Sequence, residues 1–280
     1  MMPEEMDEFS GYRYELMRPQ QIIAAREKSS MAFIPLGPME WHAPHMPYGT
    51  DMLHAYAISL HLAKEFGGVV LPPLPLGSET ILSPDRLRDR GFKGDEKIIG
   101  MDFPDLALPS LYIEESAFAS IVLELVRALK RQGFRVVVIV NGHGGKYHLI
   151  ALDRIAAEES ERGQVAVIHG FPVDPERRRL GGHAEKFESS FMKAYYPETV
   201  DLAALPPLGK PIKNMEFGIL DGPTCIGEPT PDYTVRENQD PRHANEKDGQ
   251  EELKNAVRLI GTRIREATRD LKLQQTAARK

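Results

Sequence analysis

Apolar and polar residues along the chain form patterns that predict strands and helices in alternation. Short apolar runs bounded by Gly or Pro are typical of buried strands. We expect such strands at 31–37, 69–71, 135–140 and 165–169. Between them, apolar residues recur every three or four positions, which is the pattern of an amphipathic helix. These helices are expected at about 19–28, 50–66, 118–132, 147–160 and 246–273.

A chain in which strands and helices alternate builds a mainly parallel sheet with helices on both faces, so the fold class is predicted to be α/β. We find no internal repeat and no linker-like segment, and residues 1–280 are expected to form one domain. Thr50 is expected to cap the helix that follows it. The last helix is amphipathic and is expected to pack on the core or on a neighbouring subunit.

Two segments, 72–113 and 205–245, are rich in loop-forming residues and lack a sustained period. We call residues 72–113 the excursion. Long ordered loops are disproportionately functional, so the excursion is expected to shape a site. Its basic residues are expected to form a solvated charged loop, with contact to an anionic substrate as the alternative. They are Arg86, Arg88, Arg90 and Lys93.

Composition narrows the classes of function. Of the 280 residues, 41% are hydrophobic and 27% are charged, as in ordinary globular proteins. The formal net charge of −6 argues against a nucleic acid partner, which needs a basic surface. A single cysteine, Cys225, excludes a disulfide framework and a cysteine-built metal site. The acidic N-terminal segment does not resemble a signal peptide, and no apolar run is long enough for a membrane helix, so a cytoplasmic protein without a membrane partner is expected.

His and carboxylate side chains are therefore the candidate metal ligands, and a first cluster of them follows the strand at 31–37. Glu40 and His42 are two residues apart, so an extended backbone points both to the same side. Asp51 stands at the start of the next helix. Ligands in open α/β sheets gather beyond the carboxyl ends of strands, and mixed N/O donors suit Zn²⁺, Mn²⁺ or Fe²⁺. The alternative is that both carboxylates are solvated loop residues. His45 is interpreted as a hydrogen-bonded loop residue, with substrate contact as its alternative.

A second candidate loop, NGHGG at 141–145, directly follows the strongest predicted strand. Its glycines let the backbone turn sharply and approach a ligand closely. The loop presents His143 at the end of a strand, where ligands gather. A phosphate-binding loop is the rival interpretation, although the glycine spacings of the dinucleotide and P-loop motifs are absent.

A third cluster, at 183–190, contains His183, Glu185 and Glu188. His183 and Glu188 are each a candidate metal ligand or proton carrier. The alternative, which this segment alone favours, is the charged start of a surface helix.

Together these segments resemble the creatininase (creatinine amidohydrolase) family. The family's motifs look like PLGSxEQHGPHLPxxTD, NGHGGN and HAGxxETS. This chain has PLGPMEWHAPHMPYGTD at 35–51, NGHGGK at 141–146 and HAEKFESS at 183–190. A fourth segment, QDPRHANEKDG at 239–249, is similar to the family's GDPxxATxEKG. The resemblance spans most of the chain in the same order, and it is specific for the family but not for a substrate.

The resemblance implies a three-layer α/β/α fold with a metal centre at the carboxyl edge of the sheet. By motif position it implies four metal ligands: Glu40, His42, Asp51 and His143. It also implies that Asp51 bridges the ions where two are bound. Creatininase carries a further Glu ligand two residues after the loop His, where this chain has Gly145. Glu188 is therefore the expected substitute ligand, and His183 is the expected proton shuttle.

The family's chemistry implies a metal-dependent hydrolase in which a metal-activated water attacks the carbonyl of a small non-peptide substrate, a cyclic amide or a formamide. The catalytic residues are then His183 and Glu188, which protonate the leaving nitrogen. One or two divalent transition metal ions are expected, with Zn²⁺ as the first candidate and Mn²⁺ or Fe²⁺ as alternatives.

Four other functions stay open. Two are enzymes: a ring-opening hydrolase of a carbocyclic diketone such as a dehydro-inosose, and a deformylase of a formylamino-pyrimidine nucleotide. The other two are a metal-binding maturation or assembly partner without catalysis, and a nucleotide-binding module that uses NGHGG for phosphate. Residues 78–102 of the excursion look longer than the corresponding segment of creatininase. Because substrate pockets are built from such loops, creatinine itself is not assumed. The resemblance also implies a homo-oligomer, often a hexamer.

Overall fold

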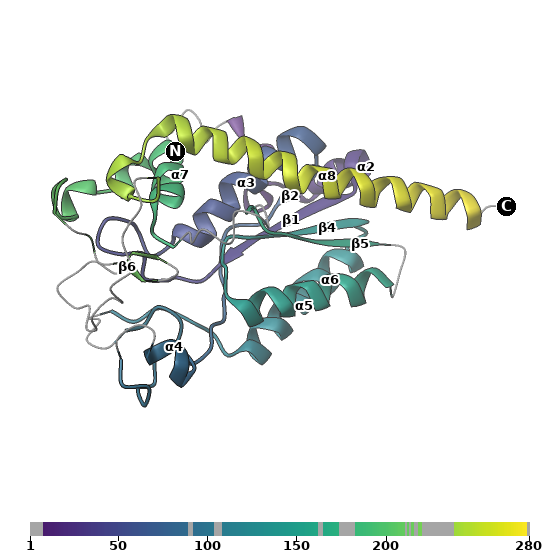
Figure 1. Ribbon diagram of the computed structural model, residues 1–280. Helices are drawn as coiled ribbons and strands as arrows, with labels where there is room; N and C mark the ends of the chain where they lie inside the picture. Colours follow the sequence, from purple (N-terminus) through teal and green to yellow (C-terminus); the bar gives the residue numbers. More distant parts are fainter. Residues whose placement is uncertain are drawn as a thin grey trace.

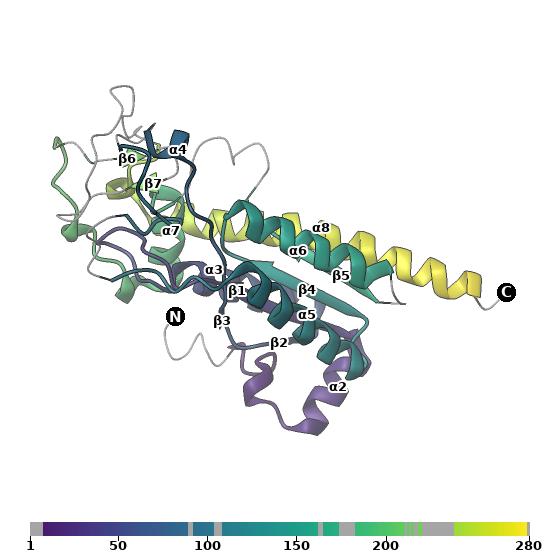
Figure 2. The same ribbon diagram turned by 90° about the horizontal axis from the view of Figure 1, so that it is seen from below.

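A parallel sheet with helices on both faces forms the centre of the molecule (Figures 1 and 2). The computed structural model describes residues 8–88, 92–103, 108–161, 165–173, 183–210, 212, 214–215, 218–219 and 238–278. Arg90 and Cys225 lie outside the described residues.

The sheet consists of β1 (Met31–Gly37), β2 (Val69–Val70), β3 (Leu74–Pro75), β4 (Val136–Asn141) and β5 (Ala166–Gly170). The strand order is β2-β1-β4-β5, β3 also pairs with β1, and every pairing is parallel. In β1 and β4 the register runs from Met31 opposite Val136 to Leu36 opposite Asn141. The carboxyl ends of these two strands therefore lie side by side, which brings the loops that follow them together. A separate antiparallel pair consists of β6 (Asn214–Met215) and β7 (Gly218–Ile219).

The helices are α2 (Pro19–Ser29), α3 (Thr50–Phe66), α4 (Pro84–Arg88), α5 (Glu115–Arg131), α6 (Lys146–Glu161), α7 (Lys186–Tyr195) and α8 (Glu246–Ala278). Short 3₁₀ turns occur at Tyr14–Leu16, Pro197–Thr199, Leu202–Ala204 and Pro241–His243. Within the part of the chain that the structure describes, no helix has both the length and the apolar character needed to cross a membrane.

Alternate residues of the central strands contribute to two hydrophobic cores, one on each face of the sheet. Phe33 and Val138 pack with residues of α3, α7 and α8. Ile34 and Ile139, their neighbours along the strands, pack with residues of α5 and α6. This separation follows from the two-residue period of a strand, which points successive side chains to opposite faces. Figure 1 shows α3 and α8 above the sheet and α5 and α6 below it, so the predicted three-layer α/β/α fold is confirmed.

The predicted strands and helices agree closely with the structure, although α7 and the β6–β7 pair are not among the predicted elements. Two further details differ. Thr50 is the first residue of α3, and Gly49 occupies the N-cap position, so the expected cap at Thr50 is wrong. The Thr50 hydroxyl instead donates to the carbonyl of Pro47 at 2.7 Å.

The excursion contains β3, α4 and a small apolar core of its own. The buried residues of this core are Leu87, Phe92, Ile98 and Phe103. Their irregular spacing explains why no period reveals this core.

Candidate metal centre

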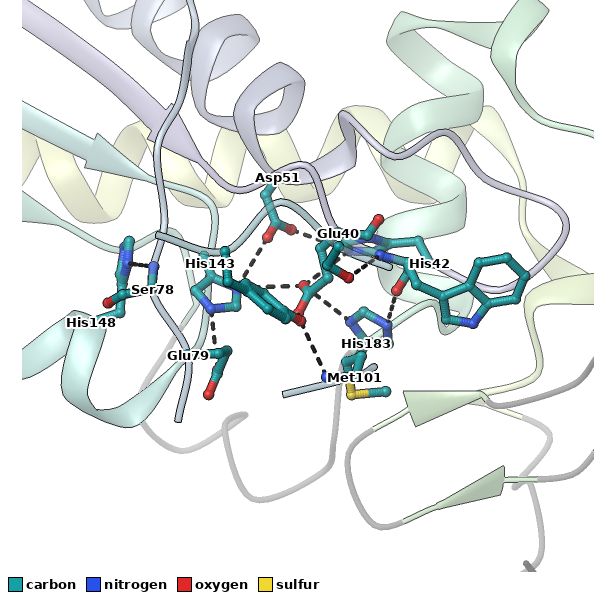
Figure 3. A network of polar contacts seen from close by, with 12 residues as sticks. Glu40, His42, Asp51, Ser78, Glu79, Met101, His143, His148 and His183 are labelled. Carbon is teal, nitrogen blue, oxygen red and sulfur yellow. Dashed lines mark hydrogen bonds and ion pairs between the residues drawn. The ribbon is translucent and has the colours of Figure 1, made fainter. Parts of the chain in front are cut away.

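Loops that follow β1 and β4 meet the first turns of α3 and α7 at the carboxyl edge of the sheet (Figure 3). Four side chains there are almost completely enclosed: Glu40 is 3% exposed, His42 0%, Asp51 2% and His143 4%. The structure brings together every residue that the sequence predicts as a ligand or proton carrier. They are Glu40, His42, Asp51, His143, His183 and Glu188.

Asp51 is held at the centre of this cluster by two glycines. A Cβ on Gly37, the last residue of β1, would lie 2.5 Å from the Cβ of Asp51. A Cβ on Gly142, the first residue after β4, would lie 2.0 Å from the Asp51 carbonyl oxygen. The ends of both central strands therefore need glycine so that the first turn of α3 can sit against them.

The two carboxylate oxygens of Asp51 face different histidines. Oδ1 lies 3.2 Å from Nε2 of His42, and Oδ2 lies 3.1 Å from Nδ1 of His143. Ligand atoms that lie within 4.8 Å of one another form three groups: Glu40–Asp51–His143, His42–Asp51–Glu188 and Glu40–His42–His183. The first two groups share Asp51, which is the arrangement expected of a carboxylate that bridges two ions.

His42 has one ring nitrogen free for a metal ion. Its Nδ1 lies 3.0 Å from the backbone oxygen of Glu40, so the Nδ1–H is the donor and the tautomer is fixed. Its Nε2 is buried without a hydrogen-bond partner among the described residues. This nitrogen faces carboxylate oxygens of Asp51 at 3.2 Å and Glu188 at 3.6 Å. A buried, unpartnered imidazole nitrogen among carboxylates fits a divalent transition metal ion.

Both carboxylate oxygens of Glu40 contact neighbouring side chains. Oε2 lies 3.4 Å from Nδ1 of His143 and 3.6 Å from Nδ1 of His183. Oε1 accepts a hydrogen bond from the hydroxyl of Tyr112, which itself accepts from the backbone N–H of Met101 at 3.1 Å. Burial and the neighbouring carboxylate of Glu40 raise the pKa of Tyr112 well above its ordinary value, so Tyr112 remains a donor.

Asn141 fixes the backbone of the glycine loop through its side-chain amide. Oδ1 accepts from the N–H of His143 at 2.9 Å, and Nδ2 donates to the carbonyl of His143 at 2.8 Å. His148 donates from Nε2 to the same Oδ1 at 2.9 Å and accepts at Nδ1 from the N–H of Ser78 at 3.3 Å. Burial lowers the pKa of His148 well below its ordinary value, which keeps the ring neutral as this pattern requires. The network joins the excursion to the glycine loop.

His183 and Glu188 enter the cluster from either side of the start of α7. Nε2 of His183 lies 2.7 Å from the carbonyl oxygen of Trp41 and donates to it. Glu188 lies in the first turn of α7, and its Oε2 accepts from the N–H of Ala184 at 2.6 Å. The segment is thus the charged start of a helix and a contributor to the cluster at the same time.

His45 is buried beside the cluster and has a partner of its own. Its Nε2 lies 2.8 Å from the hydroxyl of Ser189. Burial lowers its pKa to about 4, so the ring is neutral at physiological pH. The interpretation of His45 as a hydrogen-bonded loop residue is confirmed.

The ionisable groups of the cluster shift one another's pKa values. Burial by itself lowers the pKa of His42, but Asp51 and Glu188 outweigh it and raise that pKa to about 10. Burial, assisted by Asp51, raises the pKa of Glu188 to about 8. Burial opposes ionisation of Asp51, yet His42 and His143 hold its pKa well below the ordinary value. Phosphate sites are built from N–H donors, whereas the carboxylates of Glu40, Asp51 and Glu188 offer oxygen acceptors here. This geometry therefore disfavours the phosphate-loop interpretation of NGHGG.

A cavity of about 910 Å³ opens over the cluster. This volume is within the range of pockets that enclose drug-sized ligands. Its apolar wall comes largely from the excursion and the segments around β5 and α7, and includes Leu82, Met101, Phe103, Phe171 and Phe187. Arg88 pairs with the exposed Asp85 and Lys93 is exposed, as expected of a solvated charged loop.

Two residues of the site are not predicted from the sequence. Tyr112, at the end of the excursion, supports Glu40, and Glu79 lies with Oε1 3.2 Å from Nε2 of His143. Figure 3 shows Asp51 and Glu79 on opposite sides of the His143 ring. Neither residue belongs to a motif or a periodic pattern, so the sequence offers only the general signal that long ordered loops carry function.

The family model described as "Creatininase: Creatinine amidohydrolase" matches residues 15–264. The creatinine amidohydrolase of Pseudomonas putida is 27% identical over 188 residues, which are 60% of this chain and 65% of that protein. The 3-dehydro-scyllo-inosose hydrolase of Thermotoga maritima is 20% identical over 205 residues, 69% of this chain and 59% of that protein.

The mycofactocin precursor peptide peptidase of Mycolicibacterium smegmatis is 28% identical over 127 residues, 43% of this chain and 42% of that protein. The chain therefore covers between 42% and 65% of the length of these three relatives.

Solved structures of creatininase share the fold. A crystal structure of creatinine amidohydrolase (creatininase) matches with a TM-score of 0.62 and 21% identity, covering 90% of this chain and 96% of that one. A structure described as "Creatininase Mn" and a creatininase variant of "Zn-Zn type" match with TM-scores of 0.60 and 0.61, each at 21% identity over 91% of this chain and 97% of that one.

Proposed function

The chain belongs to the creatininase family, and we propose that it is a metal-dependent hydrolase that acts on the carbonyl group of a small non-peptide amide. The observation that carries the proposal is the sharing of Asp51 between two groups of candidate ligands, Glu40–Asp51–His143 and His42–Asp51–Glu188. Each group combines imidazole with carboxylate, the mixture that Zn²⁺, Mn²⁺ and Fe²⁺ accept. The Mn and Zn-Zn forms of creatininase support a divalent ion in this family.

When bound, such an ion supplies a Lewis acid for a carbonyl oxygen and lowers the pKa of a bound water. The chain's own residues would bind the ions, and Asp51 would contribute to both groups of ligands. The enclosed side chains of Glu40, His42 and Asp51 limit the access of bulk water to this region. Tyr112 and Asn141 hold two of the ligands, Glu40 and His143, from outside the cluster.

His183 is proposed as the group that carries the proton to the leaving nitrogen. It lines the cavity beside Glu40 and Glu188. Its Nε2–H is engaged by the carbonyl of Trp41 at 2.7 Å, so Nδ1 is the atom that can accept and return a proton. Glu188, which lines the same cavity, is proposed as a ligand and as the second candidate for proton transfer.

A cyclic amide or a formamide is the proposed substrate class, in keeping with the named activity of the Pseudomonas relative. The Thermotoga relative is named for hydrolysis of an inosose, which keeps ring opening of a carbocyclic diketone as an alternative. A cavity of about 910 Å³ exceeds what one small ring needs. This volume favours a second candidate, hydrolysis of a peptide, in line with the name of the Mycolicibacterium relative.

Metal analysis of the purified protein, combined with a substrate panel, tests the proposal. We expect bound transition metal in the native protein, and its loss together with activity in His42→Ala and His143→Ala. His243→Ala is the matched control, because His243 is exposed and lies outside the cluster. The panel should contain cyclic amides, formamides including a formylamino-pyrimidine nucleotide, carbocyclic diketones and peptides. Metal without hydrolysis across the panel would favour a non-catalytic maturation or assembly partner, and absence of metal would refute the proposal.

A further inference from the structure

Glycine at position 145 leaves space that another segment of the chain fills. A Cβ built on Gly145 would lie 2.4 Å from Oε1 of Glu79 and 2.6 Å from Nε2 of His143. The carboxylate of Glu79, from the excursion, therefore occupies the position that a side chain at 145 would take beside the ring of His143. A side chain at 145 and the observed position of Glu79 exclude each other.

Glu79 is held in this position by contacts on each side. The N–H of Ser78, its neighbour, donates to Nδ1 of His148 at 3.3 Å. The N–H of Thr80 donates to Oε2 of Glu79 at 3.0 Å, which leaves Oε1 toward His143. The chain of Gly100 passes so close that a Cβ there would lie 2.8 Å from Cγ of Glu79. The side chain of Glu79 is only 17% exposed. The carboxylate of Glu79 is thus an ordered part of the site and not a solvent-exposed surface group.

The imidazole of His143 lies among three carboxylates, two of which face Nδ1 and one of which faces Nε2. Nδ1 is 3.1 Å from Oδ2 of Asp51 and 3.4 Å from Oε2 of Glu40, and Nε2 is 3.2 Å from Oε1 of Glu79. Histidines that bind metal through one nitrogen usually donate the other N–H to a carboxylate or carbonyl, which fixes the tautomer and the ring orientation. Nδ1 faces the candidate ligands, whereas Nε2 faces Glu79.

We propose that Glu79 is a positioning residue of the metal centre, which keeps the proton of His143 on Nε2 and presents Nδ1 to the ion held with Glu40 and Asp51. The inference rests on the proposed function, since it concerns the same metal centre. It assigns to the excursion a direct part in building that centre, in addition to its part in the cavity wall.

Metal binding by the whole chain measures this role without any assay of activity. Isothermal titration with Zn²⁺ and with Mn²⁺ should show that Glu79→Ala weakens binding about 10-fold to 100-fold, the range for loss of an outer carboxylate. Glu79→Gln keeps an oxygen acceptor for the Nε2–H and should lose less. Asp95→Ala, which removes an exposed carboxylate from the same excursion, is the control and should bind as the native chain does.

The atom that binds the metal can be read directly by NMR of Zn²⁺-loaded protein labelled with ¹⁵N in histidine. The native protein should show His143 coordinated through Nδ1 with Nε2 protonated, and Glu79→Ala should lose this single tautomer. Coordination through Nε2 in the native protein, or unchanged metal affinity in Glu79→Ala, would overturn the inference while leaving the proposed function intact. A native chain that binds no metal would refute both, so the two failures are distinguishable.

A variant at position 145 provides a second test that does not depend on removing Glu79. Gly145→Ala should displace both Glu79 and the ring of His143, because its Cβ would lie 2.4 Å from Oε1 of Glu79 and 2.6 Å from Nε2 of His143. We therefore expect it to weaken metal binding at least as much as Glu79→Ala. Native-like metal binding by Gly145→Ala would contradict the inference, and thermal melting of each variant reports whether it is folded.

Discussion

The backbone of Gly142 lies directly against that of Asp51, so closely that a Cβ on Gly142 would be 2.0 Å from the Asp51 carbonyl oxygen and 2.7 Å from its carbonyl carbon. This contact joins the end of β4 to the first turn of α3. Since a further glycine, Gly37, approaches Asp51 from the end of β1, the position of the central carboxylate depends on two residues that have no side chain.

Gly142→Ala is expected to be poorly tolerated, because the methyl group meets backbone atoms that cannot rotate away. We expect a loss of about 3 kcal/mol in the free energy of unfolding, at the upper end for overpacking, together with loss of metal binding. Urea denaturation and metal titration measure both effects. Gly144→Ala is the matched control in the same loop, because its Cβ would meet only the ring of Phe171 at 3.9 Å. Equal effects of the two substitutions would contradict the argument.

Asp51→Asn is expected to lower the bound metal content more than any other single ligand substitution. Asp51 belongs to two candidate ligand groups, Glu40–Asp51–His143 and His42–Asp51–Glu188. The amide keeps the shape of the side chain but supplies only one oxygen and no charge. We expect the affinity for both ions to fall by at least about 100-fold, beyond the range for an outer residue, measured by titration and by metal content after dialysis. Asp153→Asn, at an exposed carboxylate of α6, should retain native metal content. Retention of two ions by Asp51→Asn would refute a bridging role.

Tyr112→Phe removes the hydroxyl that donates to Glu40 and leaves the ring in place. We expect metal affinity to fall about 10-fold, the lower end of the range for a residue that orients a ligand. Tyr48→Phe is the control, because the Tyr48 hydroxyl donates to the carbonyl of Leu108 and to no predicted ligand. If both variants bind metal equally well, then Tyr112 has no role in orienting Glu40.

Glu159 lies away from the metal centre, and its ion pairs lead us to expect that the free energy of unfolding depends on pH. Its buried carboxylate lies 2.6 Å from Nζ of Lys130 and 3.3 Å from Nε of Arg127. Burial raises its pKa, but hydrogen bonds and charge from Lys130 and Arg127 outweigh burial and lower the pKa below the ordinary value. Stabilisation from a carboxylate with a lowered pKa is complete above the unfolded value of about 4.3 and is lost as the pH falls through the folded value.

Glu159→Gln should therefore reduce the free energy of unfolding by about 2 kcal/mol at pH 7, and the difference from the native chain should shrink below about pH 4.3. Urea denaturation at several pH values between neutral and acid measures this difference. Glu161→Gln, an exposed change on the same helix, should have little effect at any pH. A difference that stays constant with pH would contradict the assigned ion pairs.

The candidate ligands could be proposed because their motifs resemble those of a known family and because three of them lie at the ends of recognisable elements. Glu40 and His143 follow the apolar strands β1 and β4, and Asp51 begins a periodic helix. Parallel strands end at a common edge, so residues far apart in the sequence could be expected to meet there. Glu79 and Tyr112 could not be predicted in this way, because the excursion has no period and its course depends on contacts such as that of Ser78 with His148.

The sequence by itself determined the α/β class and the order of the elements, because these depend on local periodicity. Its resemblance to a known family indicated candidate metal ligands. Tertiary structure alone decided which carboxylate lies beside Nε2 of His143. The motif comparison pointed to Glu188 as the substitute ligand, and Glu188 lies in a candidate ligand group with His42 and Asp51. The space that Gly145 leaves beside the ring of His143 is occupied by Glu79. The physical reason is that space left by a glycine can be filled from any segment that folds against it, and such long-range packing leaves no local pattern in the sequence.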